Sequence, residues 1–98
     1  MSKVYVISKS AHDFSPANKY GELKFLSEGP MNRYSVNNIH RQFKSILKNS
    51  SPDDYILICG LTIMSSIACM IFAEMHGKVN ILLFKQGDYI ERNLIIRD

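Results

Sequence analysis

The stretch that decides the fold is YILICGLTIMSSIACMIFAEMHGKVNILLF, residues 55–84. Residues 55–60 form a continuous apolar run, which is typical of a strand covered on both faces. Residues 61–76 are apolar nearly all round, which indicates a buried helix. Gly77 follows them, and glycine is favoured just after the last turn of a helix. Residues 78–84 return at once to a strand pattern. Strand, helix and strand in such a short stretch predict a βαβ unit with parallel strands and a right-handed crossover.

The segments on either side extend this unit into a larger sheet. Residues 3–8 and 22–27 are rich in β-branched, aromatic and apolar residues, and each predicts a strand. Residues 35–48 carry an apolar stripe at helical spacing, and residues 89–96 predict a last strand antiparallel to its neighbour. The predicted fold is α/β, a single domain over residues 1–98. It is a small three-layer Rossmann-like sandwich of about five strands, mostly parallel with an antiparallel edge strand at the C-terminus, and two main helices.

Residues 55–73 also permit a second interpretation, because they carry no charge and are about long enough to span a bilayer. However, Gly60, Thr62 and Ser65 interrupt the run, and a strand pattern follows almost at once. We therefore favour a domain in water over a membrane span and expect no membrane partner.

Composition and cysteine usage predict the environment of the chain. It has 98 residues, of which 46% are hydrophobic, and this suits one folded domain. Cys59 and Cys69 lie in apolar surroundings without the spacing of a disulfide or zinc motif, so we expect buried free thiols. The N-terminus shows no signal-peptide pattern, and we expect a cytoplasmic protein.

The charge is unevenly spread, because residues 1–50 carry a net +5 and residues 51–98 a net −2. A basic half favours an anionic partner, either a phosphate-bearing small molecule or a nucleic acid, but a solvated basic face explains it equally well. Arg41, Lys44 and Lys48 would form a basic stripe on a helix. There is no aromatic-interleaved RNA motif and the charge excess is small, so nucleic-acid binding is the weaker alternative.

Polar side chains and a glycine gather where the predicted parallel strands end. In open α/β sheets, ligands bind beyond the carboxyl ends of the strands, near helix N-termini whose N–H groups suit an anion. Basic side chains of the loops at 11–21 and 29–35 would meet the charge, and tyrosines would stack on a base. Turn and helix-cap chemistry explains the same residues, and the 11–21 loop is either a lid or only a connector. The predicted ligand-binding residues are Ser15, Lys19, Tyr20, Asn32, Arg33, Tyr34, Gly60, Thr62 and Ser65.

The sequence predicts neither a catalytic site nor a metal site. His12 and Asp13 are adjacent and cannot chelate a metal without further ligands. Ser15 lacks a nucleophile elbow, and Cys59 lies in an apolar run that lowers its reactivity. Neither a Walker motif nor a G-x-G-x-x-G motif occurs, so no cofactor is predicted and enzyme activity is not favoured.

The predicted helix at 61–76 has few polar residues with which to face water. Met64, Ile67, Ile71 and Met75 would be hard to hide in so small a monomer. We expect them to pack against a second copy in a homo-oligomer, and burial within the chain is the alternative.

Several segments carry a family resemblance: AHDFS (11–15), YGELKFLSEG (20–29), NRY (32–34) and the 55–84 stretch. Together they resemble small, uncharacterised proteins of tailed bacteriophages. The resemblance implies a protein made in the host cytoplasm and useful to a virus. Proteins of this kind often inhibit a host factor, sequester a signalling molecule or assist host takeover, and no such role attaches to particular residues here.

The leading expectation is a non-enzymatic binding protein that holds an anionic, nucleotide-like small molecule at the sheet edge, for example to sequester a signalling nucleotide. The alternative is an oligomeric protein–protein interaction module or an inhibitor of a host protein. A ligand-dependent thermal shift would favour the first, and loss of partner capture on disrupting the 61–76 helix would favour the second.

Overall fold

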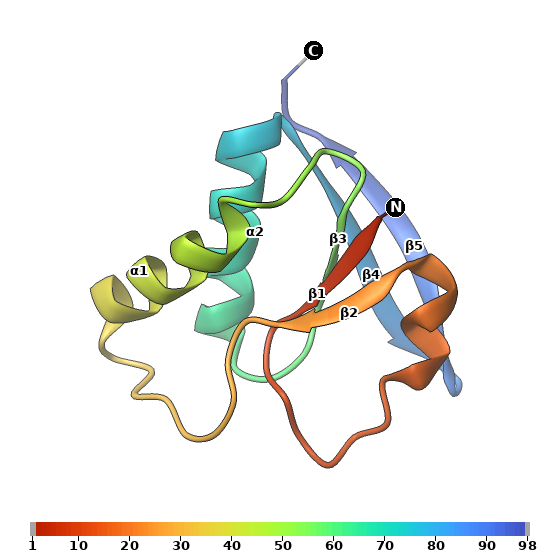
Figure 1. Cartoon of the computed structure of the whole chain (residues 1–98), viewed down its shortest axis with the longest axis horizontal. Coiled ribbons are helices and arrows are strands. Elements are labelled where there is room, and N and C mark those ends of the chain that lie inside the picture. Colours follow the sequence, from red (N-terminus) through yellow and green to blue (C-terminus); the bar gives the residue numbers. More distant parts are fainter. Residues whose placement is uncertain (1, 98) are drawn as a thin grey trace.

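A five-stranded sheet in the order β2-β1-β3-β4-β5 forms the centre of the computed structural model, which describes residues 2–97 (Figure 1). The first four strands are parallel, and β5 runs antiparallel to β4. The predicted α/β fold is therefore confirmed. Its elements are β1 (Lys3–Val6), the 3-10 helix η1 (Ser15–Tyr20), β2 (Glu22–Phe25), α1 (Val36–Leu47), β3 (Tyr55–Leu57), α2 (Thr62–His76), β4 (Lys78–Lys85) and β5 (Asp88–Ile95).

The strand order creates a topological switch point between β1 and β3. From β1 the chain moves outward to β2, returns past β1 to β3, and then continues to β4 and β5. The segment after β1 passes over one face of the sheet, and α2, which follows β3, packs on the other (Figure 1). A crevice between two such loops at the carboxyl edge is the usual ligand position in doubly wound sheets.

Three layers result, but the third is thin. Both α-helices lie on one face, where Phe43 of α1 and Phe72 of α2 join Tyr5 and Ile56 of the sheet in one buried core. On the opposite face η1 and the loop before it cover Val4, Val6, Leu57 and Leu82 (Figure 1). Segment 11–21, expected to be a lid or a connector, is thus a packed part of the fold. Its Ala17 is fully buried.

The length of β4 and β5 distinguishes them from the rest of the sheet. Each has eight residues, whereas β1, β2 and β3 have three or four. The two strands are joined at Gln86 and Gly87, which have φ values of 51° and 83°. Positive φ at both turn residues is typical of two-residue hairpin turns, whose backbone twist matches the twist of the two strands that they join. The predicted turn and antiparallel edge strand are confirmed.

Helix α2 is apolar on two sides because it has two partners, the sheet and α1. Met64, Ile67 and Ile71 are only 3%, 4% and 6% exposed. The expectation that these three side chains could not be buried within one chain is therefore wrong. The alternative, burial within the chain, holds for them. Met75, at 38%, keeps an exposed surface. Self-association as such stays a prediction.

Residues 55–73 do not form one continuous helix. Within residues 2–97, no helix is both long enough and apolar enough to cross a membrane. Residues 55–57 of that run are a strand, and α2 has 15 residues.

Candidate functional site

A pocket of about 300 Å³ opens at the switch point, and we call it the switch-point pocket. It is formed by the segments that follow β1 and β3, together with the β4–β5 hairpin. Its position is the one that the parallel-strand rule predicts. Its volume is at the lower end of the range for small-molecule sites. The lining residues are Ser8, Ser10, His12, Phe14, Ile58, Cys59, Gly60, Phe84 and Tyr89.

One wall of this pocket is aromatic. The ring of His12 lies edge-on to Phe14 and to Phe84, with centroid separations of 5.0 and 4.9 Å. Phe84 in turn contacts Tyr89 at 5.3 Å, and the Tyr89 hydroxyl is 3.2 Å from Nε2 of His12. Edge-to-face contacts and a hydrogen bond hold these rings in place, so the wall is preformed.

The opposite side joins the ends of β1 and β3. The thiol of Cys59 points to the carbonyl of Ser8, with a sulfur–oxygen distance of 3.7 Å. Gly60 adopts φ 73°, and a Cβ there would lie 3.4 Å from the Cβ of Ser8, so the two loops approach closely. Burial raises the pKa of the Cys59 thiol, which therefore remains protonated at neutral pH. A protonated thiol acts as a small apolar side chain and is a poor nucleophile.

The N-terminus of α2 begins two residues after Gly60. Its N-cap residue, Leu61, offers no side-chain hydrogen bond to the first turn. The positive end of the helix dipole therefore faces the rim of the pocket without a capping oxygen. Ser65, predicted to bind ligand, instead donates its hydroxyl to the carbonyl of Cys59 at 3.1 Å and secures the turn.

A model of the Phage Pam3 gp32-like protein family matches residues 2–96. The chain belongs to the Phage Pam3 gp32-like protein family. The predicted resemblance to small phage proteins is thereby confirmed. No curated protein and no solved structure matched the chain.

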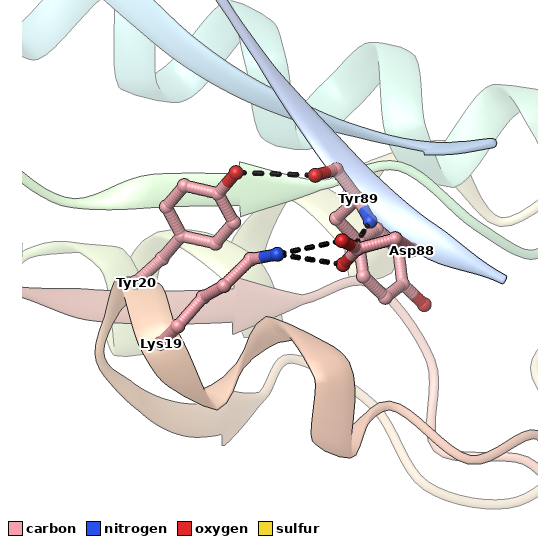
Figure 2. A network of polar contacts seen from close by, with 4 residues as sticks. All are labelled: Lys19, Tyr20, Asp88 and Tyr89. Atoms are coloured by element: carbon pink, nitrogen blue, oxygen red, sulfur yellow. Dashed lines mark hydrogen bonds and ion pairs between the residues drawn. The ribbon is translucent and has the colours of Figure 1, made fainter.

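In this gp32-like protein, Lys19 and Tyr20 do not reach the switch-point pocket. Figure 2 shows both side chains directed at the start of β5. The ammonium of Lys19 lies 2.8 and 2.7 Å from the two carboxylate oxygens of Asp88, and the hydroxyl of Tyr20 donates to the carbonyl of Tyr89 at 3.1 Å. This set of contacts, the η1–β5 network, attaches η1 to the edge strand. The lid hypothesis for these two residues is not supported by their placement.

The other predicted residues are also outside the pocket, with one exception. In the 29–35 loop of the gp32-like chain, Asn32 accepts a hydrogen bond from the Tyr34 amide, and Arg33 lies over the Tyr34 ring at 5.7 Å. The amide of Ser15 donates to the carboxylate of Asp13 at 2.9 Å, so Asp13 stabilises the turn in which it lies. Thr62 is exposed in the first turn of α2. Of the nine predicted residues, Gly60 alone lines the switch-point pocket.

The sequence pattern does not predict the aromatic wall. In the sequence, His12 suggests only a catalytic or metal-binding residue, and Phe84 and Tyr89 only strand residues. The available signal was their position, since all three lie near strand ends at the predicted ligand edge. Within residues 2–97 of this gp32-like protein, no cluster of three His, Cys, Asp or Glu side chains is arranged to hold a metal.

Proposed function

We propose that this phage protein is a non-enzymatic binding protein for a small planar ligand with an anionic group, of the nucleoside monophosphate or cyclic nucleotide class. The observation that carries the proposal is the switch-point pocket, which combines the expected ligand position with an aromatic wall. A pocket of about 300 Å³ suits one base rather than a dinucleotide. Sequestration of a signalling nucleotide in the host cytoplasm would be the biological role.

The residues that line the pocket differ from those that the sequence predicts for binding a ligand. The lining of the pocket, among the described residues, contains neither Lys nor Arg. Stacking on the rings of His12 and Phe84 would therefore supply the affinity for the base. The anionic group would lie against the uncapped N-terminus of α2 beyond Gly60, in place of the predicted contacts with Lys19 and Arg33.

Binding without chemistry is the function that the lining residues favour. Burial raises the pKa of Cys59, and this keeps the thiolate population low. The Nε2 atom of His12 is engaged with the Tyr89 hydroxyl. An activated nucleophile needs a base that is itself oriented by a third group, and the pocket lining includes no carboxylate for that purpose among the described residues.

The proposal is tested by calorimetric titration of the protein with nucleoside monophosphates and cyclic nucleotides. Phe84 is half-exposed, so Phe84→Ala should fold, and it should weaken binding about 5- to 150-fold because stacking on a base is worth roughly 1–3 kcal/mol. Tyr34→Ala is the matched control, since it removes an exposed aromatic ring from the 29–35 loop. Absence of binding by every nucleotide, or an equal loss in both variants, would overturn the proposal.

A second candidate function rests on a different surface. A groove of about 670 Å³, the interhelix groove, runs between α1 and α2 with an apolar floor that includes Met70 and Met75. The α1 wall carries His40 and Lys44, and α1 contains no acidic residue. Glu74 lines the α2 side, so the basic side chains are confined to the α1 wall. An apolar groove with this wall fits an amphipathic helix of a host protein that carries acidic residues along the side that faces α1.

The interhelix groove is tested with an acidic, leucine-rich helical peptide. Binding in a fluorescence titration should weaken in Met70→Asp, which places a charge on the exposed floor, and fall with added salt. Met70→Leu is the conservative control and should bind as the parent does. Peptide affinity unchanged by Met70→Asp, or a preference for nucleic acid at the Lys44 wall, would contradict this candidate.

A further inference from the structure

The edge strand β5 has an open, apolar end. Leu94, Ile95 and the residue that follows the strand, Ile96, are each between 49% and 58% exposed, a high value for three consecutive large aliphatic side chains. On its other side β5 pairs with β4, and the register places Lys78 opposite Ile95. A long, flat, apolar edge is a template for a further strand, and natural proteins usually block such an edge.

The hydrogen bonds show which backbone groups point outward. The amide of Ile96 donates to the carbonyl of Gly77 at 2.8 Å, which continues the β4–β5 register by one pair. Because backbone groups alternate in direction along an antiparallel pair, the even-numbered residues of β5 face β4. The N–H and C=O groups of Glu91, Asn93 and Ile95 therefore face the free edge.

The first half of this edge is already occupied. The carbonyl of Tyr89 accepts the Tyr20 hydroxyl, as Figure 2 shows, and the carbonyl of Glu91 accepts the guanidinium of Arg92 at 2.7 Å. Among the described residues, no side chain donates to or accepts from the outward backbone groups of Asn93 and Ile95. The open part of the edge is thus the segment around Leu94.

We propose that two copies of the chain pair through this segment, antiparallel and centred on Leu94, so that their two sheets become one. Asn93 of each copy then lies opposite Ile95 of the other, and the four outward backbone groups that were free are paired. Leu94 faces its own counterpart. The proposal is independent of the ligand, because the switch-point pocket lies at the other end of β5.

The free backbone groups select this register and this partner. They belong to Asn93 and Ile95, and a two-fold axis at Leu94 pairs all of them with those of a second copy. A register centred on Arg92 would oppose two arginines. Registers centred on Asn93 or Ile95 would oppose Ile95 to Glu91 or Asn93 to Arg97, although the Glu91 carbonyl already accepts from Arg92 and the Arg97 amide already donates to Gly77. An open edge whose free groups are symmetric about Leu94 is complementary to itself, which favours a second copy over an unrelated strand.

The pairing is tested by cysteine cross-linking of the full chain. Residues directly opposite in a pair without mutual hydrogen bonds have Cα atoms about 4.5 Å apart, which a disulfide can bridge. Leu94→Cys should therefore give a disulfide-linked dimer under mild oxidation. Leu83→Cys changes a partly exposed leucine of β4 away from the edge and is the matched control. It should give no disulfide-linked dimer, and neither should the parent chain with Cys59 and Cys69.

Sedimentation equilibrium provides the second readout. The parent chain should show a concentration-dependent dimer, and Ile95→Lys, which adds a charge to an exposed edge position, should shift it to monomer without loss of fold by circular dichroism. A parent chain that is monomeric at its highest soluble concentration would overturn the proposal. So would cross-linking of Leu83→Cys as efficient as that of Leu94→Cys.

Discussion

At the residue scale, Lys19 and Tyr20 join the 3-10 helix η1 to the start of β5. Their chemistry suits an anionic, aromatic ligand, and the sequence does not show which side chains engage them. Their partners, Asp88 and Tyr89, lie 69 residues further along the chain. Residue type predicts what a side chain is able to bind, but only the tertiary fold determines what already binds it.

The ion pair between Lys19 and Asp88 predicts a pH dependence of stability. The hydrogen bond from Lys19 lowers the pKa of Asp88, and the same bond raises the pKa of Lys19. A lowered carboxyl pKa contributes stability above the ordinary Asp range, and that contribution is lost as pH falls through the folded-state pKa. The stability that the Lys19 ammonium contributes is present at lower pH and is lost as the pH rises through the raised pKa of Lys19.

Asp88→Asn should therefore lower the free energy of unfolding at neutral pH and reduce its loss in acid. Urea unfolding at neutral and acid pH measures both effects. Lys19→Met serves as the partner variant in a double-mutant cycle, in which the two effects should not add. Both side chains are exposed, so added salt should shrink the difference. An acid profile of Asp88→Asn identical to that of the parent would contradict this assignment.

At the element scale, the 55–84 stretch was predicted well because its signals are local. The helix begins at Thr62 and ends at His76, and Gly77 follows with φ 73° as the left-handed C-cap. The 3-10 helix η1 was not predicted, since a single short turn has little intrinsic stability and depends on packing. The double burial of α2 was also missed, because it requires knowing that α1 covers its outer side.

Gly21 joins η1 to β2 and gives the prediction at this scale. Its φ is 153°, and an added Cβ would lie 2.2 Å from the carbonyl oxygen of Ser2. Because the backbone of Ser2 cannot move aside as a flexible side chain can, Gly21→Ala should push the first residues of β1 and β2 apart. Gly29→Ala is the control: its φ is 78° and its Cβ meets nothing within 4 Å.

Urea unfolding should rank the two glycine variants. Gly29→Ala should cost about 1–2 kcal/mol, the usual penalty for a left-handed residue with a side chain. Gly21→Ala should cost more, because the steric overlap adds to the conformational penalty. Equal losses in the two variants would show that the Ser2 contact does not constrain the turn.

At the scale of the whole molecule, the sequence predicts the position of a pocket better than it predicts the residues that line it. Parallel strands share a carboxyl edge whatever their side chains, so the position of the switch-point pocket followed from topology. Its aromatic wall joins His12 and Phe14 from one loop to Phe84 and Tyr89 from the distant hairpin. That meeting depends on the packing of segment 11–21 over the sheet, which no local pattern encodes.

The switch-point pocket and the proposed pairing segment of β5 lie far enough apart to function together. The switch-point pocket lies at the carboxyl edge beside Tyr89, and the proposed pairing segment surrounds Leu94 at the opposite end of β5. A dimer formed through β5 would thus carry two accessible pockets, and ligand binding should not depend on dimer formation. Ile95→Lys should accordingly bind a nucleotide as tightly as the parent chain.

Binding of a nucleotide-like ligand in the switch-point pocket is tested most directly by amide NMR titration of the labelled protein with a nucleoside monophosphate. We predict saturable shifts at Ser8, His12 and Gly60, with the amides of the 29–35 loop unmoved. Shifts confined to the 29–35 loop, or no shift with any nucleotide of this class, would contradict it.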